Sequence, residues 1–131
     1  MGRVVPVISI VDDDDLCREA VEHLVRSLGL TACAFASAEL CLRSPRLKET
    51  RCLIADIQMP TMDGFELQQQ LSELGFAIPI IFVTAFPDDA VKTRAMDAGA
   101  VCFLNKPLDL GGGRLAACLQ RALGGEPSGN P

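Results

Sequence analysis

The chain has 131 residues, which fits a single domain with a complete hydrophobic core. Hydrophobic residues make up 49% and charged residues 22% of the chain, a composition typical of globular proteins that excludes a disordered one. The formal net charge is −5 and there is no basic run, so a nucleic-acid surface is not expected, and a cation or a basic partner surface is favoured.

The chain opens with an apolar run and continues with a helical stripe. Residues 4–11 are apolar and β-branched apart from Pro6 and Ser9, which predicts a strand, because proline is tolerated near a strand start. In residues 16–28 the apolar side chains recur at helical spacing, and Gly29 stands where glycine commonly ends a helix. These segments predict the first strand and helix.

The same alternation continues to the end of the chain. Further strands are predicted at residues 30–35, 52–55, 78–83 and 101–104. Further helices are predicted at residues 38–42, 65–74, 90–98 and about 115–122. Continuous apolar strands that are each followed by a helix indicate a parallel sheet with helices on both faces, an α/β fold. We expect residues 1–125 to form this domain and residues 126–131 to form a flexible tail.

The six cysteines form neither a C-x-x-C pair nor a Cys/His cluster with metal-ligand spacing. They are Cys17, Cys33, Cys41, Cys52, Cys102 and Cys118. Four of them lie in apolar stretches, where free cysteine behaves as a small hydrophobe, so we expect reduced core thiols and a cytoplasmic protein. The sequence has no signal-peptide pattern and no apolar run near the ~20 residues that span a bilayer, so neither export nor membrane insertion is expected.

Polar residues follow the predicted strands. In doubly wound sheets, ligands bind outside the carboxyl ends of the strands. These ends carry Asp12 to Asp15, Asp56, Thr84 and Lys106. If the first and third strands are neighbours, Asp12, Asp13 and Asp56 converge, and two carboxylates ~5 Å apart repel by about 3 kcal/mol at an effective dielectric of 20. Oxygen ligands in a small cluster suit Mg²⁺, and Lys106 is expected to be a second cation.

Four segments carry a resemblance to a known family. They are IVDDDD (10–15), ADIQMPTMDG (55–64), IIFVTA (80–85) and DAGAVCFLNKP (97–107). In this order and spacing they resemble the receiver domain of bacterial two-component response regulators, and the resemblance covers residues 4 to about 123. The region that runs from Thr84 to Pro107 is most similar to the branch that includes the nitrogen-fixation regulator FixJ.

The resemblance implies a (βα)₅ flavodoxin-like fold with strand order 2-1-3-4-5. It implies that Asp56 accepts a phosphoryl group from a phosphohistidine on a sensor histidine kinase or a phosphotransfer protein, because a carboxylate nucleophile can form an aspartyl phosphate. It further implies that Thr84 hydrogen-bonds the phosphoryl group and that Lys106 pairs with its charge. Such a domain catalyses only its own phosphorylation and dephosphorylation, so it is a signalling module and not an enzyme.

The same resemblance implies the ligands of a Mg²⁺ ion. Asp12, Asp13 and Asp56 match the acids of the family, and Gln58 would supply its backbone carbonyl. The neighbouring Asp63-Gly64 has a structural interpretation as a turn and helix N-cap. Asp14 and Asp15 are likewise expected to begin a helix, where the dipole favours acids, although Asp14 could reach the metal through water.

The resemblance also implies a switch made by Thr84 and Phe103. Phosphorylation would move the Thr84 hydroxyl and open space for the Phe103 ring, which changes the surface made by residues 90–98, 101–104 and 115–122. That surface would bind a downstream protein partner or form a homodimer. The run Gly111-Gly112-Gly113 departs from the family pattern, so we expect the last helix to start late or to fray.

Two other functions are alternatives for a chain with these acids. A Mg²⁺-dependent phosphohydrolase that uses an aspartyl phosphate needs a second acid two residues after its nucleophile, and Gln58 stands there. A binding module with a non-phosphorylatable site is the remaining alternative, and the intact acids, Thr84 and Lys106 argue against it. With no helix-turn-helix after Leu123 and no basic region, no direct nucleic-acid output is expected of this chain. It is either a stand-alone receiver or an excised domain, and the short tail favours a stand-alone protein.

Overall fold

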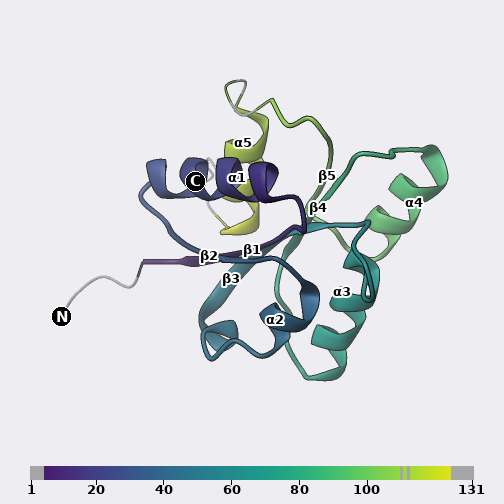
Figure 1. Cartoon of the computed structure of the whole chain (residues 1–131), viewed down its shortest axis with the longest axis horizontal. Coiled ribbons are helices and arrows are strands. Elements are labelled where there is room, and N and C mark those ends of the chain that lie inside the picture. The colour runs from purple at the N-terminus through teal and green to yellow at the C-terminus, as the bar shows by residue number, and fades with distance from the viewer. Residues whose placement is uncertain (1–4, 110, 112, 125–131) are drawn as a thin grey trace.

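The computed structural model describes residues 5–109, 111 and 113–124, in which strands and helices alternate (Figure 1). The strands are β1 (Val7–Val11), β2 (Thr31–Phe35), β3 (Thr50–Asp56), β4 (Ile80–Thr84) and β5 (Cys102–Asn105). The α-helices are α1 (Asp15–Ser27), α2 (Ala38–Leu42), α3 (Gly64–Glu73), α4 (Asp89–Asp97) and α5 (Arg114–Ala122). A 3₁₀ turn, η1 (Leu47–Glu49), precedes β3.

The strands form one parallel sheet in the order β2-β1-β3-β4-β5. This order and the (βα)₅ α/β fold confirm the sequence prediction. In the register, Val11 of β1 stands beside Ala55 of β3, and Thr84 of β4 stands beside Asn105 of β5. The residues that end or follow these strands therefore meet at one edge of the sheet.

Helices cover both faces of the sheet: α1 and α5 lie on one side, and α2, α3 and α4 lie on the other (Figure 1). Ile8 and Ile10 pack with α1 and α5, whereas Val11 and Leu53 pack with the opposite helices, because side chains alternate between the faces of a strand. Both faces are buried, which explains why the strands are continuous apolar runs in the sequence.

Every strand has at least one boundary that differs from the prediction, and two of the starts have a local cause. Strand β1 begins at Val7, and residue 4, where the predicted strand starts, lies outside the described residues. Pro6 has no N–H to donate to the sheet, and only its carbonyl oxygen takes part, accepting from the Thr31 amide at 3.1 Å. Strand β3 begins at Thr50, two residues before the predicted start. The Thr50 hydroxyl lies 2.7 Å from the Ser9 hydroxyl, and this buried polar pair extends the strand into residues for which no strand was predicted.

Helix α1 begins as predicted but buries less than its sequence suggests. Asp14 caps it by accepting hydrogen bonds from the amides of Leu16 and Cys17. The predicted apolar stripe is wrong at its start, since Leu16 is 79% exposed, and only Val21 and Val25 of the helix are fully buried.

The cysteine prediction is wrong for one pair. Cys102 of β5 and Cys118 of α5 form a disulfide, with Cα atoms 6.1 Å apart, whereas the other four cysteines are free. The two are 16 residues apart and belong to no motif. They meet because α5 packs on the sheet face toward which Cys102 points.

The last helix starts late, as the glycine run predicts. Helix α5 begins at Arg114, after Gly113 in the left-handed region with φ 84°, and no side chain caps it. Gly112 and the predicted tail at residues 126–131 lie outside the described residues. Among the helices that are described, none has the length and apolar character needed to cross a bilayer.

Candidate functional site

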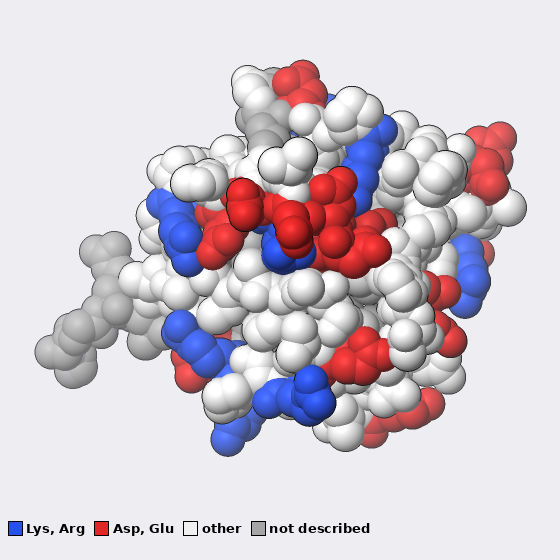
Figure 2. All heavy atoms as spheres, in the orientation of Figure 1, with Lys and Arg blue, Asp and Glu red and all other residues white. Residues whose placement is uncertain are grey.

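Polar side chains gather at the edge of the sheet where the parallel strands end. Asp12 directly follows β1, Asp56 ends β3, Thr84 ends β4 and Lys106 directly follows β5. Figure 2 shows acidic side chains in a band over the end of β1 and the start of α1, with basic atoms enclosed within it. The structure thus places the predicted site residues of four strands side by side.

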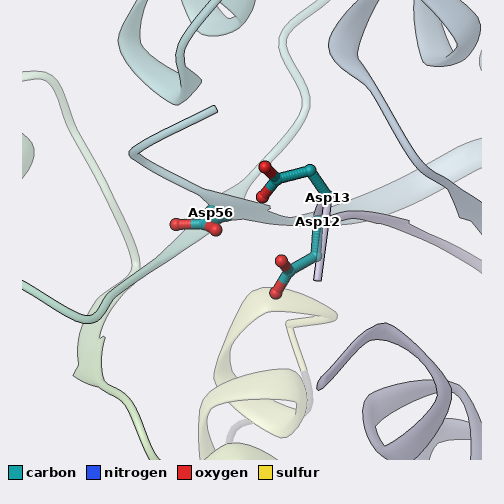
Figure 3. A group of neighbouring side chains, drawn as sticks. All are labelled: Asp12, Asp13 and Asp56. Atoms are coloured by element: carbon teal, nitrogen blue, oxygen red, sulfur yellow. The ribbon is translucent and has the colours of Figure 1, made fainter. Parts of the chain in front are cut away.

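Three carboxylates form the acidic part of the site. One oxygen each from Asp12, Asp13 and Asp56 lies within 4.8 Å of the others (Figure 3). Asp12 and Asp56 are buried, whereas Asp13 is exposed. The convergence that was expected if β1 and β3 are neighbours is therefore present, and it results from the pairing of Val11 with Ala55.

Lys106 joins the two buried carboxylates. Its Nζ atom lies 3.0 Å from an oxygen of Asp12 and 3.0 Å from an oxygen of Asp56, and the lysine side chain is itself largely buried. One ammonium cannot neutralise three carboxylates, so the cluster keeps an excess of negative charge that attracts a further cation. The peptide bond that follows Lys106 is cis.

The ionisable groups have shifted pKa values. Burial raises the pKa of Asp56 to about 6, with the charge of Asp12 acting in the same direction and the hydrogen bond from Lys106 opposing both. Burial lowers the pKa of Lys106, but the hydrogen bonds to Asp12 and Asp56 outweigh burial and hold that pKa above its usual value. Near neutral pH, Lys106 is charged and Asp56 is a carboxylate that can act as a nucleophile.

The donor atoms of the cluster fit a hard cation such as Mg²⁺. Carboxylate oxygens are ligands that Mg²⁺ accepts, and no histidine belongs to the group. Cys17 lies beside Asp12, and burial together with that carboxylate raises the pKa of its thiol to about 12. The thiol therefore stays neutral and does not add a thiolate that would select a softer metal.

Thr84 and Gln58 are joined by their side chains. Thr84 is 0% exposed; its hydroxyl donates to Oε1 of Gln58 at 2.5 Å and accepts from the Phe86 amide at 3.0 Å. The Gln58 amide nitrogen of the backbone donates to Oδ1 of Asp56 at 3.2 Å. Sequence reasoning considered the backbone carbonyl of Gln58 and missed its side-chain bond, which no local pattern signals.

Phe103 lies on β5 beside Phe82 of β4, half-buried against the helices of the α3 side. It lines a shallow hollow together with Lys92 of α4 and Arg114 of α5. The residue thus reaches the surface that α4, β5 and α5 share. It does not belong to the acidic cluster.

The loop between β3 and α3 depends on a glycine whose role the sequence did not reveal. A Cβ atom on Gly64 would lie 2.7 Å from the carbonyl oxygen of Asp56, so only glycine fits. The predicted N-cap at Asp63 is present and forms a capping box with Glu66. The sequence of the Asp63-Gly64 pair predicts only a turn, whereas the close approach of Gly64 to the Asp56 carbonyl can be seen only in the tertiary fold.

The comparisons with known proteins identify the family. Residues 8–117 match the model of the response regulator receiver domain, so the chain belongs to this family of two-component signalling domains. It is 46% identical over 101 residues to the response regulator protein TodT of Pseudomonas putida, an alignment that covers 77% of this chain and 44% of TodT. The chain thus spans less than half the length of this relative.

Solved structures agree with this family. A structure of the response regulator StyR superposes with a TM-score of 0.82 at 38% identity, covering 92% of this chain and 60% of that one. The crystal structure of FixJ-N superposes with a TM-score of 0.79 at 29% identity, covering 93% and 96%. The likeness to FixJ-N is consistent with the predicted branch.

Proposed function

We propose that this domain takes a phosphoryl group from a phosphohistidine onto Asp56 and relays the signal through its α4-β5-α5 surface. The donor would be a sensor histidine kinase or a phosphotransfer protein. The observation that carries the proposal is the contact of the buried Asp56 carboxylate with the Lys106 ammonium, within a cluster that holds two further acids, at the sheet edge where Thr84 also ends its strand.

The transfer needs positioning and charge neutralisation more than proton transfer. An oxygen of Asp56 attacks the phosphorus while the bond from phosphorus to the imidazole nitrogen of the donor breaks, and the imidazole leaves with its electron pair. Lys106, which contacts Asp12 and Asp56 in the unphosphorylated chain, would neutralise charge on the phosphoryl oxygens. The Thr84 hydroxyl donates a hydrogen bond to one of them.

Mg²⁺ is the proposed cofactor. Asp12, Asp13 and Asp56 would hold it together with the backbone carbonyl of Gln58, and the bound ion would offset the negative charge of the acids and of the incoming phosphoryl group. Without a divalent cation, phosphoryl uptake should fail, because the excess negative charge of the cluster repels an anionic donor.

The output is a change in protein binding. Thr84 and Phe103 form the proposed switch, in which withdrawal of the hydroxyl toward the phosphoryl group opens space for the ring of Phe103. The altered α4-β5-α5 surface would bind a downstream protein or a second copy of the chain, and no direct contact with nucleic acid is proposed. The domain would span residues 1–125 and act in the cytoplasm as a signalling module that turns over only its own phosphoryl group.

Intact-protein mass spectrometry tests the proposal. The chain is incubated with Mg²⁺ and a small acyl phosphate, beside Asp56→Asn and beside a sample that contains EDTA. One added phosphoryl group on the original chain alone is expected. Because small donors fail with some receivers, binding of beryllofluoride with Mg²⁺ is measured in parallel; loss of both uptake and mimic binding would favour a non-phosphorylatable binding module.

A further inference from the structure

We propose that the side-chain amide of Gln58 is a latch that holds the Thr84 hydroxyl in its unphosphorylated position and so sets how readily the switch turns. The inference rests on the proposed function, because it assumes that Thr84 moves to a phosphoryl group on Asp56. It assigns to Gln58 a positioning role that is separate from the backbone carbonyl proposed for the metal.

The hydrogen bonds of Thr84 are the basis of the latch. A threonine hydroxyl has one proton, and here that proton is donated to Oε1 of Gln58 at 2.5 Å. The oxygen also accepts from the Phe86 amide at 3.0 Å, so the buried hydroxyl is satisfied as it stands. It can donate to a phosphoryl oxygen only after it releases Gln58. The hydrogen bond that Thr84 donates to Gln58 and the one that it would donate to a phosphoryl oxygen therefore exclude one another.

Gln58 is well placed to couple the phosphoacceptor to the switch. Its backbone amide contacts Asp56 and its side chain contacts Thr84, so one residue bridges the ends of β3 and β4. The Gln58 side chain is exposed, so its amide can turn to water when the hydroxyl leaves. A neutral hydrogen bond of this kind shifts an equilibrium by about three- to tenfold, enough to bias the switch without locking it.

The test removes the acceptor and keeps the side-chain length, by Gln58→Met. The first readout is the Thr84 side-chain rotamer in the metal-free protein, from three-bond NMR couplings: one rotamer is expected in the original chain and a mixture in the variant. The second readout is the dissociation constant for beryllofluoride with Mg²⁺, which should fall about three- to tenfold. Affinity for Mg²⁺ alone is measured for both proteins, and the beryllofluoride constants are compared at saturating Mg²⁺, so that a change in metal binding is separated from a change in the latch.

Two background variants make the test specific to the hydroxyl. In Thr84→Val, which has no proton to donate, Gln58→Met should leave beryllofluoride affinity unchanged; in Thr84→Ser, which restores the hydroxyl, the gain should return. An equal gain in the Thr84→Val background would overturn the latch, and so would an unchanged Thr84 rotamer. If the original chain binds no beryllofluoride, the proposed function fails, while the rotamer in the metal-free protein still decides whether the latch exists.

Discussion

The two halves of the site are held by different forces. In the acid half (Asp12, Asp13, Asp56 and Lys106), a buried ammonium lies 3.0 Å from two buried carboxylates. In the switch half (Thr84, Gln58 and Phe103), a buried hydroxyl is held by a neutral bond to an exposed amide. Truncating one partner of a buried ion pair is costly, whereas a neutral bond to an exposed side chain exchanges readily with water. The difference separates a fixed place for chemistry from a movable one for signalling.

The largest predicted effect breaks the acid half. Lys106→Met leaves two buried carboxylates without their cation, and we expect the free energy of unfolding in EDTA to fall by about 3–5 kcal/mol in urea titrations. Mg²⁺ should restore part of the loss, and so should the second change Asp56→Asn, which removes one of the repelling charges. A variant as stable as the original chain in EDTA would show that the ion pairs do not hold this half together.

The next effect concerns the disulfide between Cys102 and Cys118, which joins β5, the strand of Phe103, to α5. Closing a loop between residues 16 apart contributes about 3 kcal/mol, so Cys118→Ala should lower the free energy of unfolding by about that amount under oxidising conditions and far less under reducing ones. Cys17→Ala, at a free cysteine, is the control that a reductant should not distinguish. Alkylation of the unfolded, unreduced chain should modify four thiols; modification of all six would contradict the pairing.

A smaller effect is expected in the loop that supports Asp56. Gly64→Ala brings a Cβ atom against the Asp56 carbonyl, and the resulting shift should cost about 1–3 kcal/mol and slow phosphoryl uptake. Gly111→Ala is the matched control for stability, since neither Gly111 nor Gly64 has a positive φ and an added Cβ on Gly111 would meet only Asp109 Oδ1, at 4.0 Å. If both variants lose the same free energy of unfolding and take up the phosphoryl group at the original rate, the close approach of Gly64 to Asp56 does not contribute to function.

The most gradual effect is the pH dependence of the metal-free protein. The folded pKa of Asp56, about 6, lies above its ordinary value, so its contribution to stability is present below that ordinary value and is lost as the pH rises through 6. The stability of Asp56→Asn relative to the original chain should therefore rise between pH 4 and about pH 7 and then level off. Urea unfolding in EDTA measures this difference, and a fall over the same range would give the shift the opposite sign.

The fold could be predicted largely because its signals are local. Apolar runs and helical stripes indicate the elements, and the rule that ligands bind at the carboxyl ends of parallel strands predicts from the sequence alone that Asp12, Asp56, Thr84 and Lys106 share one edge of the sheet. The errors arose where tertiary contacts decide: β3 starts early because of the Ser9 and Thr50 pair, and the first turn of α1 projects into solvent.

The candidate site divides in the same way. The residue types and their spacing predict the charged groups of the site, but they do not predict the contacts that hold those groups in place. The Cys102 and Cys118 pair, the approach of Gly64 to Asp56 and the bond between Gln58 and Thr84 all join residues that share no motif. Each of these contacts depends on how helices, strands and loops pack together, and no periodic pattern in a single sequence indicates such packing.

Site-resolved detection of the aspartyl phosphate tests the central claim most directly. The chain is first reacted, in the presence of Mg²⁺, with a small phosphoramidate, a donor that has the same phosphorus–nitrogen bond as phosphohistidine. It is then reduced with borohydride, which converts an acyl phosphate into an alcohol, and its peptides are analysed by tandem mass spectrometry. The proposed function predicts homoserine at position 56 alone, absent when EDTA is present during the reaction. Homoserine at position 12 or 13 in place of 56 would contradict the assignment of Asp56 as the phosphoacceptor.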